Sequence, residues 1–287
     1  MFGVRRSAEQ KMWKSLRKLF QGLIDDTKKG GWVISNRGFH NFMKSNAVSQ
    51  FLNRVLSKMT HTIRVDTAGS WREAATKGNN GSKINGIIRN EMKGNVGFVV
   101  QNIISENAKY IKTLPDEWAV YASNYAAQMT MKGERPELVE AHLRKVVPEH
   151  MQKNLKTIAR TECAKANAAI VQARAEMCGI RAYIWRSVKD ERARPAHRAM
   201  DGIMVFFDDP PSPEALFPIP TYFNQEGIPY IPPPYGEYHA GNTFNCRCYM
   251  EPVVDISFLP DVIKVHDHGE IRKMTKAQIK REYGNIS

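Results

Sequence analysis

The spacing of apolar residues changes at Gly179, and this change constrains the fold more than any other feature of the chain. Before it, apolar side chains recur mostly at helical intervals. After it, residues 180–185 alternate as in a β-strand. Nine of the 15 prolines lie at 210–234, where they oppose a helix or a central strand and favour a loop on the surface. The pattern predicts an α+β fold, with a mostly α-helical N-terminal two-thirds followed by a small α+β C-terminal module with a proline-rich loop.

The helical part reads as a series of amphipathic segments. The first covers 7–24 and the second 39–59. Residues 64–83 lose the periodicity and contain three glycines, so a loop or mobile excursion is expected there. Further helices are expected over 84–111 with a break at Gly94 and Gly97, over 116–131, from Pro136 to Val146, and over 150–178.

Composition and patterning divide the chain into four segments. These are a basic helical region at 1–60, a helical domain at 61–178, a small α+β module at 179–254 and a C-terminal tail at 255–287. In the module, strands are expected at 180–188, 203–207 and 245–254, with a short helix opened by Pro195 and closed by Gly202. The tail is expected to be loosely attached, with one short helix near Lys276–Tyr283.

The basic excess lies mainly in the first segment. The chain has 42 Lys and Arg against 29 Asp and Glu, a net charge of +13, and residues 1–60 supply nine of that excess. Such a surplus attracts polyanions, either nucleic acid or an anionic membrane surface. The alternative is a solvated helix face that keeps the protein soluble. The residues expected to contact nucleic acid or a partner are Lys11, Lys14, Arg17, Lys18, Lys28 and Lys29.

Composition also excludes several classes of protein. A hydrophobic fraction of 42% is too high for a chain that is disordered throughout. No window approaches the roughly 20 apolar residues of a membrane-spanning helix. The first residues lack the apolar core of a secretory signal, and four cysteines do not form a disulfide framework. We therefore expect a protein of the reducing cytosol.

A C-x-C motif is the main candidate for metal chemistry. On a strand, Cys246 and Cys248 would point to the same face and form half of a site for a metal such as zinc. His197 and His239 are the expected remaining ligands, and Asp190 and Asp201 are weaker candidates. Since only one cysteine pair is present, the alternative is two small buried side chains without a metal.

Ionisable residues are also dense at 190–202. Asp190, His197 and Asp201 could supply general acid–base chemistry, or they could form a buried ion-pair network that holds the turn between two strands. The sequence has no HExxH, no GxSxG and no phosphate-binding glycine loop. A metal-dependent hydrolase or nuclease using His197, Asp190, Cys246 and Cys248 is therefore kept as the alternative function.

Several short motifs follow one another in a recognisable order. Along the chain they are Ile158–Glu162, Gly179-Ile180 with Trp185, Asp190–Arg192, Arg194-Pro195 with His197, Asp201-Gly202, the proline-rich loop, and Asn245–Cys248 followed by Pro252. This series resembles the phage head morphogenesis family, also called phage Mu protein F-like minor head proteins. The resemblance covers about residues 100–253, and its specificity comes from the order and spacing of many positions.

The resemblance implies a structural virion component rather than an enzyme. It would be a minor capsid protein of a tailed phage that acts in head morphogenesis at the portal and the inner head. The implied partners are the portal protein, the inner capsid or scaffold protein, and double-stranded DNA during packaging or ejection. The implied location is inside the virion head, after assembly in the bacterial cytoplasm, and contact with a membrane is expected only at DNA delivery.

The resemblance also bears on the metal. Some members of the family carry a CxxC where this chain has Arg194 and His197, and a histidine where it has Thr243. Those members look like zinc proteins. This chain keeps Cys246 and Cys248, with His197 as a retained candidate ligand and His239 as a substitute.

Overall fold

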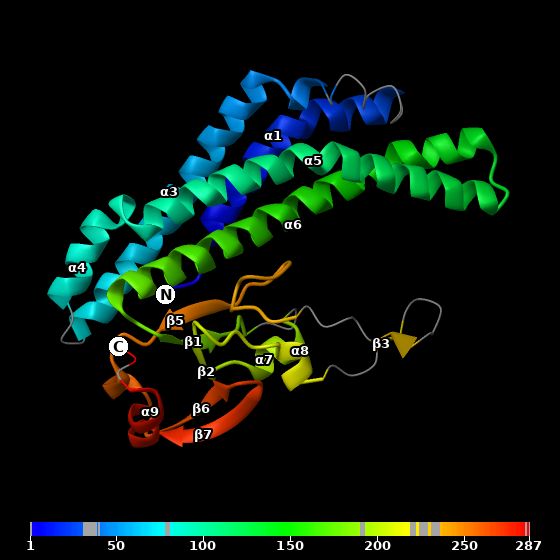
Figure 1. The fold of residues 1–287 in the computed structure, drawn as a ribbon. Coiled ribbons are helices and arrows are strands. Elements are labelled where there is room, and N and C mark those ends of the chain that lie inside the picture. The colour runs from blue at the N-terminus through cyan, green and yellow to red at the C-terminus, as the bar shows by residue number, and fades with distance from the viewer. Residues whose placement is uncertain are drawn as a thin grey trace. The chain divides into compact units, whose positions relative to one another are not determined.

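The computed structural model has an α+β fold, with the helices in the N-terminal two-thirds (Figure 1). Two compact units make up the chain: a helical unit of residues 6–62 and 101–162, and a sheet unit of residues 1–5, 63–100 and 163–287. None of the described helices combines the length and apolarity needed to cross a membrane. The structure describes residues 2–30, 39, 41–77, 81–189, 193–218, 222–223, 229–230, 236–284 and 286.

Four long helices among the described residues form most of the helical unit. These are α1 (Arg6–Gly30), α3 (Asn46–Lys77) up to Thr62, α5 (Asn95–Met131) from Gln101, and α6 (Pro136–Cys178) up to Glu162. The amphipathic helix predicted over 7–24 is confirmed and is longer than predicted. Its apolar stripe is buried, and the ring of Phe20 meets the edge of Trp118 with centroids 4.9 Å apart. Trp118 donates its indole N–H to Asn154, so this core includes a satisfied polar group.

The loop predicted over 64–83 is wrong for most of its length, because α3 continues to Lys77. Residues 78–80 lie outside the described part, and α4 (Gly81–Asn90) follows. The buried face of α3 contains Thr60 and Thr67, and each donates its hydroxyl to the carbonyl four residues earlier. Such bonds let small polar residues occupy a buried helix face. Because threonines take the place of apolar residues on this face, the apolar periodicity weakens although the helix continues.

The helices predicted over 116–131, 136–146 and 150–178 merge into α5 and α6, which run through Pro115 and Pro148. An internal proline costs about 3 kcal/mol, and apolar neighbours buried on either side offset that cost: Leu114, Trp118, Val147 and Met151. The predicted break at Gly94 is confirmed by the 3-10 turn η1 (Glu91–Lys93) between α4 and α5. A Cβ at Gly97 would lie 2.1 Å from the carbonyl oxygen of Met92, so only glycine fits.

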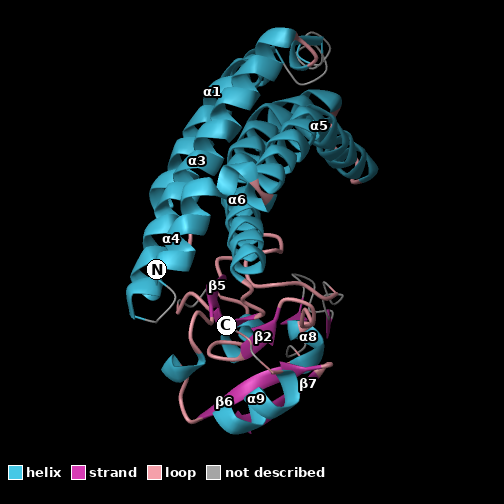
Figure 2. Ribbon diagram, turned by 60° about the vertical axis from the view of Figure 1, so that its left-hand side comes forward, coloured by secondary structure: helices cyan, strands magenta, loops and turns pink. Residues whose placement is uncertain are grey.

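A five-stranded sheet forms the centre of the sheet unit (Figure 2). Its order is β5-β1-β2-β6-β7, and all neighbours are antiparallel except β2 and β6. The strands are β1 (Ala182–Arg186), β2 (Met204–Phe206), β5 (Tyr249–Pro252), β6 (Val262–Asp267) and β7 (Glu270–Thr275). All three strands predicted in the module are present, although each is shorter than predicted.

The sheet is covered on both faces. Tyr183 and Trp185 of β1 belong to a core with residues of α3, α4 and α6, whereas Ala182 and Ile184 belong to a second core that includes residues of β6, β7 and α9 (Lys276–Tyr283). The first four residues of β1 are therefore all buried. The alternating side chains of β1 therefore point into two different cores, one on each face of the sheet. Neither face of this strand is in solvent.

The predicted loose attachment of the tail is wrong. Residues 255–287 contain β6, β7 and α9, and β6 pairs with β2 through Met204 and Val265. The predicted tail at 255–287 therefore completes the sheet of the predicted α+β module at 179–254. The predicted helix near Lys276–Tyr283 is confirmed, and Thr275 with Gln278 forms a capping box at its start.

The proline-rich stretch is described only in part. It contains α8 (Pro213–Leu216) and a separate two-stranded sheet of β3 (Tyr222–Phe223) and β4 (Pro229–Tyr230). The prediction that this stretch holds no helix is wrong for α8. Pro213 occupies the first turn, where the missing N–H needs no partner. The predicted helix opened by Pro195 is confirmed as α7 (Pro195–Ala199).

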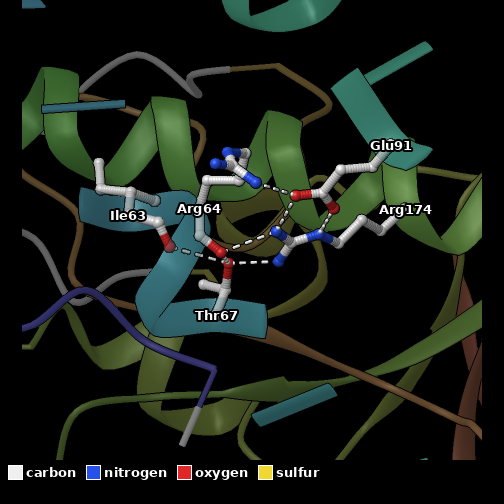
Figure 3. Close-up of polar contacts among 5 residues, drawn as sticks. All are labelled: Ile63, Arg64, Thr67, Glu91 and Arg174. Atoms are coloured by element: carbon white, nitrogen blue, oxygen red, sulfur yellow. Dashed lines mark hydrogen bonds and ion pairs between the residues drawn. The ribbon is translucent and has the colours of Figure 1, made fainter. Parts of the chain in front are cut away.

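A buried charge network ties the helices of the sheet unit together (Figure 3). The Arg174 guanidinium donates to both carboxylate oxygens of Glu91, at 2.6 and 2.9 Å. It also donates to the Thr67 hydroxyl and to the Arg64 carbonyl. Arg64 donates to Glu91 in turn, at 2.7 Å. Arg174 and Glu91 are both about 1% exposed or less, so their charges depend on each other for stabilisation.

Candidate metal centre and basic helix face

Three potential metal ligands meet in the sheet unit. The Nδ1 atom of His197 on α7 lies 3.5 Å from the sulfur of Cys246 and 3.4 Å from that of Cys248. The ligand atoms of the three residues all lie within 4.8 Å of one another, and all three side chains are buried. Two thiols and one imidazole nitrogen form a donor set that suits zinc.

The cysteines converge for a different reason from the one predicted. Cys246 and Cys248 precede β5 rather than lying on it. Asn245 has a φ of 53°, in the left-handed region, and the backbone N–H of Cys248 donates to the Cys246 sulfur at 3.4 Å. This local turn brings the two thiols to the same side.

His197 is oriented by a chain of buried polar groups. Its Nε2 atom lies 2.8 Å from the Tyr238 hydroxyl, and that hydroxyl donates to the Glu214 carboxylate on α8 at 2.8 Å. Because Tyr238 donates to Glu214, we assign the proton of His197 to Nε2, where it is donated to Tyr238. In the neutral imidazole, which is the form that binds a metal, the lone pair of Nδ1 then faces the two thiols. A histidine that donates its second N–H in this way is typical of metal ligands.

The protonation of the cluster follows from its hydrogen bonds. A hydrogen bond from Cys248 and contact with His197 hold the pKa of Cys246 well below its usual range. The bond to Cys246 and burial raise the pKa of Cys248. Burial acts to lower the pKa of His197, but hydrogen bonds with Cys246 and Glu214 outweigh it and raise that pKa. These hydrogen bonds favour the thiolate form at Cys246 more than at Cys248, and the thiolate is the form that binds a metal.

The space beside the cluster is small. Its volume is about 60 Å³, and its described lining includes Val188, Arg194, Asn245 and Arg247. A cavity needs about 10–15 Å³ to hold one water molecule, and sites for organic ligands have about 300–1,000 Å³. The space therefore suits an ion with a small fourth ligand.

The basic residues of α1 lie on its solvent face. Lys11, Lys14, Arg17, Lys18, Lys28 and Lys29 are all exposed, and the Arg17 guanidinium lies 5.8 Å from the centre of the Trp13 ring. Across the described ranges, none of the six forms an ion pair with a carboxylate. The opposite face of the helix is fully buried at Leu16, Phe20, Leu23 and Ile24.

Comparison with known proteins gives a family match. The family of phage Mu protein F-like proteins matches residues 123–251. The chain is thus similar to this family over somewhat less than half of its length. An uncharacterized protein of Haemophilus influenzae (strain ATCC 51907 / DSM 11121 / KW20 / Rd) is 28% identical over 232 residues. The match covers 80% of this chain and 46% of the relative, so the chain spans about half of the relative's length. No solved structure matches.

The family match includes all three clustered ligands and excludes α1, β6, β7 and α9. The predicted fourth ligand, His239, is not in the cluster. Its Nδ1 atom lies 3.2 Å from the Tyr183 hydroxyl, and burial lowers its pKa. Asp201 accepts a hydrogen bond from the Ser187 backbone at 2.8 Å, which holds the turn after β1. Asp190 lies outside the described residues.

Two important residues of the family-matched region were missed in the sequence. Glu214 and Tyr238 stand in or directly after the proline-rich stretch, which was predicted only to follow the surface. Both are buried. The sequence offered one sign of a buried residue here, since Glu214 is an isolated glutamate directly after a proline. Nothing in the sequence links Glu214 to His197. The charge pair of Glu91 and Arg174 was missed as well, although an arginine between Ala173 and Ala175 was a usable sign of a buried charge.

Proposed function

We propose that the protein is a structural minor head protein of a tailed phage that acts in head morphogenesis and is not an enzyme. The match of residues 123–251 to the phage Mu protein F-like family carries this proposal. The small volume beside the thiol cluster supports a structural role over hydrolysis, because a polymer substrate needs an open site.

Finer parts of the proposal concern partners and location. The exposed cations of α1 favour contact with packaged double-stranded DNA, and the family favours the portal and the inner capsid or scaffold as protein partners. The location would be inside the virion head, after assembly in the host cytoplasm. Contact with a membrane would be confined to DNA delivery.

Removal of the gene from the phage that encodes this chain tests the head function. We expect mass spectrometry to find the protein in purified wild-type heads, and electron microscopy to find fewer DNA-filled heads when the gene is absent. Complementation with the full-length gene should restore the filled heads. Absence of the protein from purified heads, together with an unchanged yield of filled heads, would contradict the proposal.

We also propose that His197, Cys246 and Cys248 hold a structural zinc ion. The donor set and the orientation of His197 through Tyr238 support it. Elemental analysis should find about one zinc per chain, and Cys248→Ser should lose it. Cys178→Ser is the matched control, because Cys178 is buried and lies outside the cluster.

Two results would argue against this structural zinc site. One is a zinc content below about 0.2 per chain in the wild-type protein. The other is equal zinc in the two cysteine variants. If the zinc-loaded protein cleaved DNA, and Cys248→Ser but not Cys178→Ser lost that cleavage, the hydrolase alternative would replace the structural role.

A further inference from the structure

A groove in the helical unit lies between α1 and α3. Its volume is about 200 Å³, which is below the range of about 300–1,000 Å³ for sites that enclose small organic ligands. The groove therefore suits one or two side chains of a larger partner. The lining residues are Ala8, Lys11, Met12 and Ser15 of α1 with Arg54, Val55, Lys58, Met59 and Thr62 of α3.

The floor of this groove is apolar. Ala8, Met12 and Met59 are 2–5% exposed, and Val55 is half-buried beside them. Methionine is flexible and polarizable, so a surface that contains two methionines adapts to different apolar side chains.

The rim of the groove is positively charged on both sides. Lys11 lines it from α1, and Arg54 and Lys58, one helical turn apart, line it from α3. All three are exposed. In the part of the chain that the structure describes, none of them is paired with a carboxylate.

An apolar floor between cationic rims selects one kind of partner. A phosphodiester backbone would satisfy the cations but would leave the apolar floor without a complement. An acidic amphipathic helix satisfies both, because an apolar side chain enters the groove while carboxylates on the next turns meet Lys11, Arg54 and Lys58. We propose that the α1–α3 groove docks an acidic amphipathic helix of a protein partner.

This proposal deepens the proposed head function by naming a class of partner. It depends on the groove alone, so it can fail in a binding assay while the head function holds in the particle assay. Of the six basic residues of α1 expected to contact nucleic acid or a partner, only Lys11 lines the groove, so the other five stay available for DNA.

The test is a binding titration with the full-length protein and a fluorescent helical peptide. The peptide carries leucines at positions i, i+3, i+4 and i+7 and glutamates at the other positions. We expect Arg54→Glu/Lys58→Glu to weaken its binding by about tenfold, since each lost exposed ion pair contributes up to about 1 kcal/mol. The matched control is Lys153→Glu/Lys156→Glu, which makes the same change in charge on exposed residues of the helical unit outside the groove and should leave binding nearly unchanged.

A second peptide separates the apolar contribution from charge. When serines replace the leucines and every glutamate is kept, we expect binding to the wild-type protein to be lost. Equal binding of the two peptides, or an equal effect of the two charge-reversed pairs, would overturn the proposal. A loss of duplex DNA binding in Arg54→Glu/Lys58→Glu without peptide binding to the wild type would assign the groove to nucleic acid instead. Should the double variant fail to fold, Lys58→Ala alone provides the same comparison with Lys153→Ala.

Discussion

At the scale of single residues, the strongest constraint is the charge network of Figure 3. Arg174 is fully buried and bonds to Glu91, which lies 83 positions earlier in the sequence. Arg64 is partly exposed and also bonds to Glu91. One carboxylate thus neutralises part of the charge of two guanidinium groups, and the network links α3, η1 and α6.

The Glu91→Gln variant tests this network. Loss of the carboxylate leaves Arg174 buried without a counter-charge, and we expect a loss of about 3–5 kcal/mol in the free energy of unfolding. The measurement is denaturant-induced unfolding of the full chain. Glu106→Gln is the control, because Glu106 pairs with Lys109 on the surface with both side chains 71% exposed, and it should cost less than about 1 kcal/mol. Equal effects of the two variants would contradict the importance of the buried pair.

At the scale of elements, the glycines of α3 and α5 have opposite roles. Gly69 lies in α3, and a Cβ there would meet nothing within 4 Å. Gly97 lies in the first turn of α5, directly against the Met92 carbonyl. The sequence alone assigns both to breaks or loops, whereas the structure distinguishes a replaceable glycine from a required one.

Alanine at each position separates the two roles. Gly69→Ala should raise the free energy of unfolding by about 0.5–1 kcal/mol, since alanine is the better helix former. Gly97→Ala should lower it by about 1–3 kcal/mol, because the new methyl group forces η1 and α5 apart. Thermal unfolding compares both with the wild type. A neutral Gly97→Ala variant would show that the break at Gly94 does not need the close approach.

Strand β6 is the element for which the sequence-based prediction was poorest, because the tail was expected to be loosely attached. Val265 is fully buried and pairs with Met204, whereas Val262 on the same strand is 55% exposed. The tail therefore contributes a buried strand to the sheet. How much a residue of β6 contributes to the free energy of unfolding depends on whether its side chain is on the buried or the exposed face.

Aspartate at each of these valines tests the role of β6. Val265→Asp buries an unpaired charge and should cost more than about 3 kcal/mol. Val262→Asp should change the free energy of unfolding by no more than about 0.5 kcal/mol. Urea unfolding of the full chain gives both values. A tolerated Val265→Asp would mean that residues 255–287 are the loose tail that the sequence predicted.

At the scale of the whole molecule, charge and family region are separate along the chain. The family-matched residues 123–251 contain the thiol cluster, and the six exposed cations expected to contact DNA or a partner lie on α1. The net charge of +13 therefore reflects mainly one helical region rather than the whole molecule. Contact with DNA would be a property of that region.

Reversing Lys14, Arg17 and Lys18 to glutamate tests contact with DNA. If α1 contacts phosphates, the slope of log K against log salt should become shallower by up to about 3, since each phosphate contact contributes about 0.9. Fluorescence anisotropy with duplex DNA at several salt concentrations measures the slope. The control reverses three exposed lysines of α6 in the same unit, Lys145, Lys153 and Lys156. An equal change in both variants would indicate a response to net charge alone.

Local pattern by itself determined much of this protein. Helical periodicity predicted α1, the break at Gly94 and the switch to strands at Gly179, because each depends on neighbours within one or two turns. The order of motifs also predicted the family and brought His197, Cys246 and Cys248 into consideration together.

Only the tertiary structure decided the rest. The parallel pairing of β2 with β6, the pair of Arg174 with Glu91 and the orientation of His197 by Tyr238 and Glu214 all join residues far apart in the chain. The helices continue through Pro115 and Pro148 because buried neighbours offset the lost hydrogen bonds. These features depend on the free energy of packing between distant segments, and no local pattern of residues records that free energy.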